Sequence, residues 1–264
     1  MRDITGTTRL FGILADPVAH VKTPQGLNAL MRARCIDGVM VPMHVTEAGL
    51  EAFVAGLRGL HNFGGFIVTV PFKSRMVALC DKVSDAALSI GAVNAVRREA
   101  DGRLVADMLD GHGFVAGLRD AGISPAGHAV FLAGAGGAAN AIAFALAEAR
   151  IARLTIHNRT AARTAELAAR LHGAFPHLPV AAGTADPSGH TLVVNATSLG
   201  LRAHDPLPLD THALTPGMTV AEVVMQPEVT PLLAHAAARG CRVQPGLPML
   251  TGQLELMARF LGMA

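Results

Sequence analysis

A glycine-rich turn in the middle of the chain constrains the fold more than any other feature. A short apolar run, Ala129–Ala133, leads into Gly134–Ala139 (GAGGAA), and an alanine-rich stretch with helical periodicity follows over Asn140–Arg150. This pattern predicts a strand, a tight turn and a helix N-terminus. Such a turn brings backbone N–H groups close to a pyrophosphate, and the helix dipole favours its negative charge. The spacing G-x-G-x-x-A fits the dinucleotide-binding fingerprint with alanine in the third slot.

The place of this turn indicates that another folding unit precedes it. About half of the 264 residues lie upstream, and the composition, 51% hydrophobic and 16% charged, is that of a globular protein with a sizeable core. Short apolar runs alternate with helical periods, which predicts an α/β fold with mostly parallel strands. We place the first domain boundary near Asp110. Two lobes imply a cleft between them, where a cofactor commonly meets its substrate.

Composition and charge exclude several classes of function. The net charge of +2, without a block of Lys or Arg, argues against nucleic-acid binding. No run of about 18 apolar residues indicates a membrane span, and charged residues interrupt the N-terminal stretch that a signal peptide needs apolar. Cys35, Cys80 and Cys241 are far apart, which fits a reducing cytoplasm and gives no metal-binding pair. The chain has no tyrosine, which excludes a tyrosine general acid.

Periodicity and end signals give the expected elements, with Thr23 as the N-cap of the first helix and Pro24 as its first residue. Strands are predicted at Arg9–Leu14, Val39–Val45, Phe66–Val70, Ala92–Arg97, Arg103–Asp107, Ala129–Ala133, Arg153–His157, Thr191–Asn195, Met218–Val224 and Arg242–Gln244. Helices are predicted at Pro24–Ala33, Ala48–Leu60, Val83–Ile90, Gly113–Asp120, Gly137–Arg150, Ala161–Leu171, Thr230–Arg239 and Pro248–Phe260.

The segment after the strand Arg153–His157 favours NADP over NAD. An NAD site usually carries Asp or Glu about 20 residues beyond the glycines. Here the strand ends in His157-Asn158-Arg159-Thr160, with Arg163 one turn further on. A planar arginine suits a 2′-phosphate, and Thr160 is placed to cap the next helix and donate to the same phosphate. The alternative is that both arginines are ordinary surface residues. The predicted cofactor contacts are Gly134, Ala135, Gly136, Gly137, Ala138, Asn158, Arg159, Thr160 and Arg163.

Three polar residues in the first half are candidates for chemistry. Val68–Lys73 (VTVPFK) places a lysine at the end of a buried strand, where functional residues of parallel sheets gather. A lysine there can exchange a proton with a hydroxyl, although most lysines are simply solvated. Asp110 is either a helix N-cap or a catalytic partner, and capping is compatible with catalysis. Asn94 either holds a substrate hydroxyl or forms a turn. No cluster of His and Cys indicates a metal site.

Together these segments resemble the shikimate dehydrogenase family almost from end to end. In the first half the resemblance is carried by Phe11-Gly12, Asp16–Pro24 (DPVAHVKTP), Val68–Lys73 and Gly91–Asn94 (GAVN). In the second half it is carried by Gly134–Ala138, Asn158–Thr160, Asn195–Gly200 (NATSLG), Thr230–Leu233 (TPLL) and Gly246-x-x-Met249-Leu250-x-x-Gln253. Each motif alone is weak, but the ordered set is specific.

The resemblance implies a two-lobed α/β protein, with an N-terminal substrate lobe containing a parallel-rich sheet and a Rossmann-type NADP lobe. On this basis residues 1–109 and 240–264 form the substrate-binding domain, and residues 110–239 form the NADP domain. It implies that Lys73 and Asp110 handle the hydroxyl proton while hydride passes to or from the nicotinamide. Substrate contacts are implied for Thr69, Asn94 and Gln253, and further cofactor contacts for Thr197 and Gly246.

The chain departs from the family at the end of the pocket that binds the substrate carboxylate. The usual Ser-x-Ser pair is replaced by Val21 and Thr23, and a tyrosine near the end of the NADP lobe is replaced by Met225. The Asn-Thr before the aspartate is Met108-Leu109, and the Asn before Val68 is Ile67. Each hydrogen bond lost to a charged group costs about 1.5–3 kcal/mol. We therefore expect one of two outcomes: shikimate is turned over weakly, or a related cyclic polyol is the true substrate. Lys22 or His20 is a candidate to compensate for the lost hydroxyl donors.

The resulting hypothesis is a cytoplasmic NADP-dependent enzyme, monomeric or homodimeric, that interconverts 3-dehydroshikimate and shikimate or a related cyclic hydroxy acid or polyol. It has no metal, nucleic-acid or membrane partner. The alternative is a non-catalytic NADP-binding sensor with the same fold, which has no use for a Lys–Asp pair. A third possibility is another two-lobed NADP enzyme such as a folate dehydrogenase, which the order of the motifs disfavours.

Overall fold

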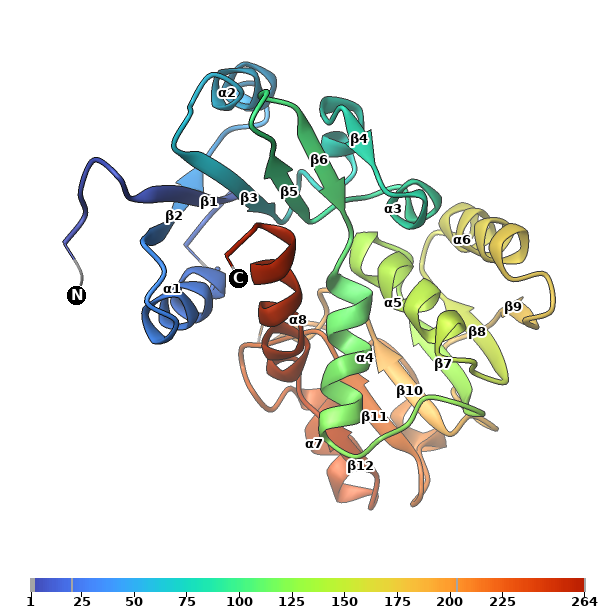
Figure 1. Cartoon of the computed structure of the whole chain (residues 1–264). Helices are drawn as coiled ribbons and strands as arrows, with labels where there is room; N and C mark the ends of the chain where they lie inside the picture. Colours follow the sequence, from blue (N-terminus) through green and yellow to red (C-terminus); the bar gives the residue numbers. More distant parts are fainter. Residues whose placement is uncertain (1–2, 20, 203, 264) are drawn as a thin grey trace. The chain divides into compact units, whose positions relative to one another are not determined.

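A computed structural model describes residues 3–19, 21–202 and 204–263, and over these residues the chain folds into two units (Figure 1). Unit 1 comprises Met1–Leu109 and Leu254–Ala264, and unit 2 comprises Asp110–Gln253. Both are α/β. Because the last helix begins in unit 2 and ends in unit 1, the C-terminal segment belongs to the fold of the first half of the chain.

Unit 1 is built on a mixed sheet with the strand order β2-β1-β3-β5-β6-β4. Strands β1, β2 and β3 run parallel, β4 runs parallel to β6, and β5 is antiparallel to both of its neighbours. The strands are β1 (Arg9–Ala15), β2 (Gly38–His44), β3 (Phe63–Val68), β4 (Lys82–Val83), β5 (Ala95–Arg98) and β6 (Leu104–Asp107), and the helices are α1 (Thr23–Ala33), α2 (Leu50–Leu57), the 3-10 helix η1 (Arg75–Leu79) and α3 (Asp85–Ile90).

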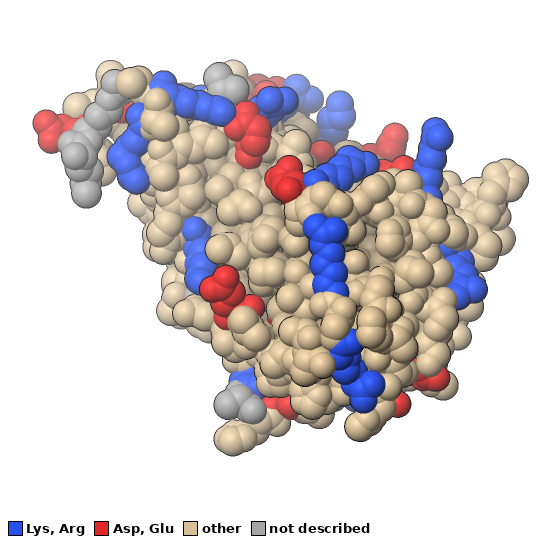
Figure 2. Space-filling model, turned by 90° about the horizontal axis from the view of Figure 1, so that it is seen from below, with Lys and Arg blue, Asp and Glu red and all other residues tan. Residues whose placement is uncertain are grey.

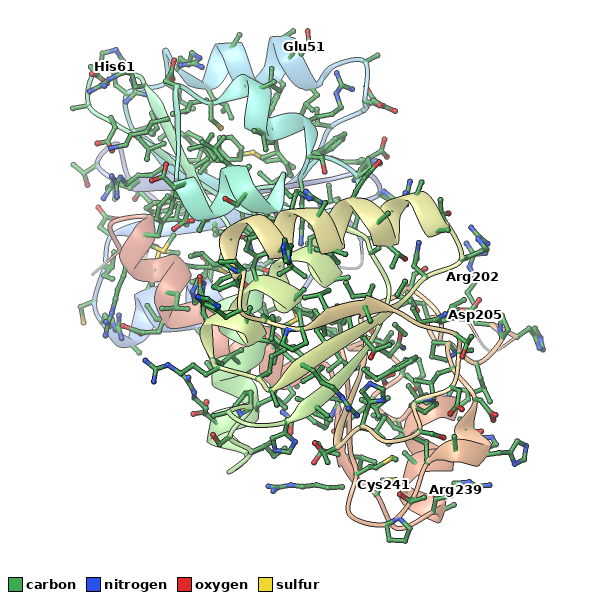
Figure 3. The ribbon with its side chains drawn as sticks, turned by 90° about the vertical axis from the view of Figure 1, so that its right-hand side faces the viewer. Glu51, His61, Arg202, Asp205, Arg239 and Cys241 are labelled. Carbon is green, nitrogen blue, oxygen red and sulfur yellow. The ribbon has the colours of Figure 1, made fainter. Side chains whose placement is uncertain are left out.

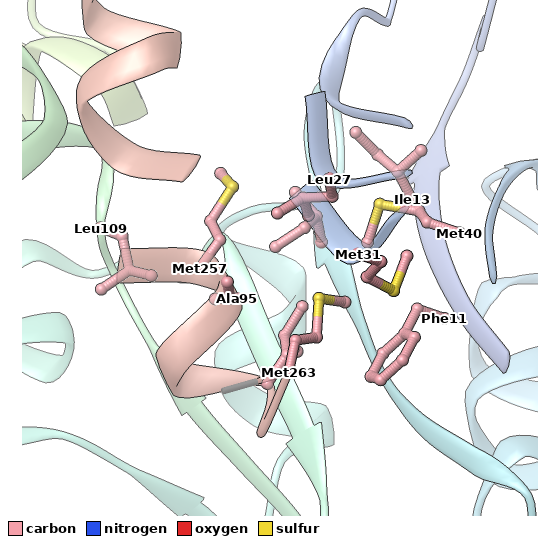
Figure 4. Close-up of a cluster of buried hydrophobic side chains, with 12 residues drawn as sticks. Phe11, Ile13, Leu27, Met31, Met40, Ala95, Leu109, Met257 and Met263 are labelled. Carbon is pink, nitrogen blue, oxygen red and sulfur yellow. The ribbon is translucent and has the colours of Figure 1, made fainter. Parts of the chain in front are cut away.

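The core of unit 1 joins the two ends of the chain. Phe11 and Ile13 of β1 and Leu27 of α1 pack in one cluster with Met257 and Leu261 from the C-terminal segment (Figure 4). Several methionines fill this cluster, and their flexible side chains suit irregular gaps between a sheet and two helices. The C-terminal segment is therefore a structural part of unit 1.

Unit 2 contains a parallel sheet with the strand order β12-β11-β10-β7-β8-β9 (Figure 1). The chain starts in the centre at β7, builds outward through β8 and β9, then returns to β10 on the other side of β7. This is the doubly wound order of dinucleotide-binding sheets, and ligands bind where the order reverses, between β7 and β10. The strands are β7 (Ala129–Ala133), β8 (Arg153–His157), β9 (Val180–Ala182), β10 (Leu192–Asn195), β11 (Thr219–Glu222) and β12 (Arg242–Gln244).

Small residues let the helices of unit 2 pack closely. A Cβ added at Gly111 would collide with the Ala141 carbonyl, and one at Gly117 would lie 2.7 Å from the Pro248 carbonyl oxygen. Three helices therefore approach each other almost at backbone distance. The helices of this unit are α4 (Asp110–Asp120), α5 (Gly137–Glu148), α6 (Ala161–Ala174), the 3-10 helix η2 (Thr211–Ala213), α7 (Pro231–Ala238) and the start of α8 (Leu247–Phe260).

The predicted fold class is confirmed, whereas some local predictions are wrong. Thr23 is not the N-cap of α1 but its first residue, and Lys22 occupies the cap position without a side-chain hydrogen bond. Pro24 tolerates this because the first turn of a helix does not use its N–H. The helix predicted from Val83 starts at Asp85, because the Ser84 side chain accepts from the Ala87 N–H and ends strand β4. Residues 240–253, predicted to return to the first domain, stay in unit 2, where β12 pairs with β11.

The surface carries scattered charges. Figure 2 shows one face of the molecule, where basic and acidic residues lie singly or in small groups among uncharged ones. Within the described part of the chain, no helix is long and apolar enough to cross a membrane.

The packing of unit 1 predicts that the C-terminal segment contributes strongly to stability. Replacing Leu261, which is 0% exposed, by Ala should lower the free energy of unfolding by about 2–5 kcal/mol, because it leaves a cavity in the core. The matched control is Leu88→Ala, at a side chain that is 53% exposed, which should change it by less than about 0.5 kcal/mol. Chemical denaturation measures both, and equal effects would contradict a core role for the C-terminal segment.

Candidate functional site

A pocket of about 400 Å³ lies in unit 2 at the carboxyl ends of β7, β8 and β10, where the strand order reverses. Three chain segments form it: the turn after β7, the end of β8 with the start of α6, and the loop after β10. Its lining residues are Ala133, Gly134, Ala135, Gly136, His157, Asn158, Arg159, Thr160, Arg163, Ala196, Thr197, Ser198, Leu199, Leu207 and Pro208.

The two glycines of the turn after β7 serve different purposes. Gly134 has φ +120°, and a Cβ there would lie 2.9 Å from the Ala196 carbonyl oxygen. Only glycine lets the turn adopt this conformation and approach the loop after β10. At Gly136, the N-cap of α5, an added Cβ would have no atom within 4 Å, and the backbone is extended, as any residue can adopt. The fold does not need glycine at this position, whereas a ligand that contacts the backbone there does.

Side-chain hydrogen bonds fix the loop after β10. The Asn195 Oδ1 accepts from the Thr197 N–H at 3.1 Å and from the Thr197 hydroxyl at 2.7 Å. The Asn195 Nδ2 donates to the Leu199 carbonyl at 3.1 Å, and the Leu199 N–H donates to Thr197 Oγ1 at 3.0 Å. These bonds hold one wall of the pocket in a single conformation.

The same loop is closed further along by a half-buried carboxylate. The Asp205 Oδ2 accepts from the Gly200 N–H and from the Arg202 N–H, each at 3.0 Å (Figure 3). Leu207 and Pro208, which follow directly, also line the pocket. Asp205 therefore brings the end of the loop back to the wall that its start forms.

The electrostatics of the pocket favour an anionic ligand. Of the described residues that line it, none is acidic, whereas Arg159 and Arg163 are basic and exposed. Thr160 is the N-cap of α6 but makes no side-chain cap hydrogen bond. Helix α5 begins directly after the turn that follows β7. The first N–H groups of a helix have no partners within it, so those of α5 can donate to a ligand in the pocket. Arginines and a helix N-terminus together suit phosphate groups.

Most of the predicted cofactor residues lie around this pocket. Gly137 and Ala138 begin α5, next to the lining residue Gly136. Gly246 does not line the pocket, because it packs against the Val224 carbonyl, where a Cβ would collide. His157, Leu207 and Pro208 line it without having been predicted. The position of His157 at a strand end was a usable signal, whereas nothing in the sequence marks Leu207 and Pro208.

In unit 1, main-chain hydrogen bonds bring three predicted site residues close together. Lys73 lies half-buried in the turn that follows β3, and its carbonyl accepts from the Val93 N–H at 3.0 Å. The Asn94 carbonyl accepts from the Val68 N–H at 2.7 Å, directly before Thr69. Lys73, Asn94 and Thr69 therefore gather at the carboxyl end of β3.

The Asn94 side chain has a structural role in addition to any role in binding. It is 1% exposed, and its Oδ1 accepts from the Leu109 N–H at 2.7 Å. Leu109 directly precedes Asp110 in the chain. Asn94 therefore fixes the backbone that leads into α4.

In unit 2, Asp110 and Gln253 lie in neighbouring parts of two packed helices. Asp110 is the first residue of α4 and is 4% exposed, and Gln253 of α8 is 3% exposed. A Cβ at Gly113, one turn after Asp110, would lie 2.6 Å from the Gln253 Cβ. The glycine thus allows α8 to bring Gln253 up to the first turn of α4.

The positions that depart from the family are apolar or buried. Val21 is half-buried against the core cluster of unit 1 and lines a second pocket of about 540 Å³, which Thr69 and Asn94 do not line. Thr23 is buried at the start of α1, and Met225 is half-buried after β11. His20 lies outside the described residues.

Comparison with known proteins identifies the family. Residues 13–96 match the family described as "Shikimate dehydrogenase substrate binding domain", and residues 120–186 match "Shikimate / quinate 5-dehydrogenase". The chain belongs to the shikimate dehydrogenase family. It is 44% identical over 259 residues to a shikimate dehydrogenase (NADP(+)) of Rubrobacter xylanophilus, covering 95% of this chain and 89% of that protein. The resemblance read from the sequence motifs is confirmed.

Solved structures of shikimate dehydrogenase relatives share the whole fold. The shikimate 5-dehydrogenase of Thermus thermophilus, in complex with NADP(H) and shikimate, is 32% identical with a TM-score of 0.87, covering 97% of this chain and 94% of that one. The 5-ketofructose reductase of a Gluconobacter strain is also 32% identical, with a TM-score of 0.84, covering 97% and 98%. The fold therefore occurs in enzymes named for different substrates.

Among the residues that the structure describes, no group of three His, Cys, Asp or Glu side chains is placed to hold a metal ion.

The different surroundings of the glycines yield a test of the pocket. Gly136→Ala should leave the melting temperature unchanged, since the added methyl group meets nothing in the fold. It should weaken NADPH binding about tenfold or more, because it blocks close approach of a pyrophosphate to the backbone. Gly173→Ala, at a site in α6 that is also open, is the control and should leave binding unchanged. Calorimetric titration measures both, and undiminished binding by Gly136→Ala would place the ligand elsewhere.

Proposed function

We propose that this protein is an NADP-dependent dehydrogenase that reversibly oxidises a secondary ring alcohol of a small cyclic hydroxy acid or polyol, shikimate or a related compound. The observation that carries the proposal is the unit 2 pocket. It combines a glycine turn, a helix N-terminus and two arginines in a chain that is 44% identical to a shikimate dehydrogenase (NADP(+)).

The residues of the pocket fit NADP better than NAD. Arg159 lies two residues beyond the end of β8, where an NAD site carries a carboxylate that accepts from the ribose 2′-hydroxyl. Unlike a carboxylate, the Arg159 guanidinium does not repel the 2′-phosphate of NADP, and its planar set of N–H groups can donate hydrogen bonds to that phosphate. The Thr160 hydroxyl, not engaged in capping α6, is a further donor. Bound here, NADP would supply the acceptor for the hydride of the alcohol carbon or, when reduced, the donor of hydride to the ketone carbon.

In this proposal Lys73 and Asp110 handle the proton of the reacting hydroxyl. As the C–H hydride leaves the substrate, the O–H proton passes to Lys73 and the C–O single bond becomes a carbonyl. In the reverse direction Lys73 returns the proton to the oxygen. Asp110 orients the lysine, and Thr69, Asn94 and Gln253 bind the hydroxyls or the ring. These roles come from the positions that the residues occupy in the family's motifs.

The substrate class is inferred from the residues at the positions where the family binds the substrate carboxylate. Val21 and Met225 replace hydroxyl donors, and Val21 is part of an apolar surface packed on the core of unit 1. The similarity to a 5-ketofructose reductase supports a range of substrates wider than shikimate for this fold. We infer a substrate rich in hydroxyl groups, for which the carboxylate contributes less binding energy than usual.

A non-catalytic sensor is not favoured, because the relatives that this chain resembles are named as enzymes, among them the shikimate dehydrogenase (NADP(+)) that is 44% identical to it. The scattered cysteines support placing the enzyme in a reducing cytoplasm.

The proposed chemistry predicts that Lys73 is required for turnover and not for cofactor binding. With shikimate and NADP⁺, Lys73→Ala should lower kcat by about 10²–10⁴-fold, the usual contribution of a general acid–base. NADPH binding, measured by calorimetry, should remain unchanged. Lys82→Ala, at an exposed lysine of β4 in the same unit, is the control and should keep full activity. Normal turnover by Lys73→Ala would remove this residue from the mechanism.

The inference on substrate class predicts that a restored hydroxyl improves the binding of shikimate. Val21→Ser should lower the KM for shikimate by about 10- to 150-fold, as one hydrogen bond to a charged group is worth about 1.5–3 kcal/mol. Val18→Ser on the same loop is the matched control and should have no effect. The idea fails if the wild-type enzyme already binds shikimate as tightly as the Val21→Ser variant.

A further inference from the structure

A buried carboxyl group lies beneath the loop that forms one wall of the nucleotide pocket. Glu222 is the last residue of β11 and is 0% exposed. It lies opposite Asn195, the last residue of the neighbouring strand β10, in the register of the parallel pair. Acidic side chains are rarely buried completely unless they are paired or have a function.

The contacts of Glu222 are with uncharged groups. Its Oε2 accepts from the Asn195 Nδ2 at 3.3 Å, and the Thr230 hydroxyl also hydrogen-bonds the carboxyl. Within the described part of the chain, its Oε1 is buried without a hydrogen-bond partner. Burial raises the pKa of Glu222, and these two hydrogen bonds only partly oppose that effect. The protonated form is therefore the one that this environment stabilises.

Glu222 and the loop together use the Asn195 amide fully. The Nδ2 donates to Glu222 and to the Leu199 carbonyl, and the Oδ1 accepts twice from Thr197. Because Glu222 offers an acceptor and Thr197 offers donors, the amide has only one satisfactory orientation. Rotating it by half a turn would place the NH₂ group against the Thr197 N–H.

The loop that Asn195 holds is the loop that lines the pocket. Thr197, Ser198 and Leu199 all line it, and the hydrogen bonds of Asn195 reach the first and the last of them. Glu222 itself does not line the pocket. Its direct hydrogen-bonded link to this wall is the Asn195 amide.

We propose that Glu222 is a positioning residue, which fixes the Asn195 amide and thereby the wall of the pocket formed by Thr197, Ser198 and Leu199. The inference rests on the proposed function, since it assumes that NADP occupies this pocket. Glu222, which does not line the pocket, would thus contribute measurably to the affinity for the cofactor.

The burial of Glu222 gives this effect a direction with pH. No charged side chain contributes to its pKa shift, as the groups that bear on it are the Asn195 amide and the Thr230 hydroxyl. Because the pKa in the folded state is raised, stabilisation by the neutral form is fully present below the unfolded value of about 4.5 and is lost as the pH rises through the folded value. Above it, an unpaired charge is buried under the loop, and the wall should loosen.

The test compares the pH dependence of the KM for NADP⁺ in the wild type and in Glu222→Gln. The amide has the shape of a neutral carboxyl group and does not titrate, so the variant should match the low-pH behaviour of the wild type and lack the rise in KM that Glu222 ionisation causes. All other residues of the pocket and the cofactor are the same in both proteins, so any effect of pH that they cause cancels in the comparison. Glu148→Gln, a partly exposed glutamate of α5 paired with His112, is the matched control and should follow the wild type.

A second variant removes the acceptor altogether. Glu222→Leu should raise the KM for NADP⁺ about tenfold or more and change kcat less, because Asn195 loses one of the bonds that orient it. A folded Glu222→Leu with the wild-type KM would overturn the proposal, and if this variant does not fold, the Glu222→Gln profile decides. If the wild type binds NADPH but its KM for NADP⁺ varies with pH in the same way as that of Glu222→Gln, this inference is overturned and the proposed function is not. Wild type that binds no NADPH in a calorimetric titration would overturn the proposed function and the inference with it.

Discussion

The close approach of two backbone segments in unit 2 is the constraint on which the nucleotide pocket depends. The turn after β7 and the loop after β10 meet where a Cβ at Gly134 would lie 2.9 Å from the Ala196 carbonyl oxygen. This contact follows from the strand order, because β10 returns to the side of β7 opposite to β8. The two segments therefore leave the sheet in neighbouring positions and open a crevice above it. A side chain at residue 134 would force them apart and change the shape of the crevice.

Each part of the nucleotide pocket follows a different strand of the parallel sheet. The glycine turn and a helix N-terminus follow β7, the two arginines lie in the segment after β8 and in the first turn of α6, and a loop that side-chain hydrogen bonds hold rigid follows β10. Strand β11 supplies no lining residue, yet Glu222 lies under the loop after β10. Rigidity in the loop has a binding advantage, since a wall that is already ordered loses little conformational entropy when a ligand arrives.

How much the sequence predicts depends on whether a feature has a local signal. The strand Ala129–Ala133, the glycine turn and Arg159 were all predicted, because period, spacing and residue type coincide there. The edge strand β9 was missed, since three residues are too few to show a period. Leu207 and Pro208 reach the pocket only through the closure of a long loop by Asp205. The burial of Glu222 was also invisible, because a charged residue at a strand end normally faces water.

The structure separates the residues proposed for the reaction from those proposed for substrate choice. Lys73 and Asn94 belong to backbone that is tied to other strands and turns by hydrogen bonds of 2.7–3.0 Å, so a change there disturbs the sheet as well as the chemistry. Val21 is only half-buried, and it meets its surroundings through apolar contact. A residue held by such contact can be exchanged for another of similar volume at little cost. On the proposed assignment of roles, the position given to the carboxylate side is thus freer to change than the positions given to the hydroxyl chemistry, and the same fold does occur in enzymes named for shikimate and for 5-ketofructose.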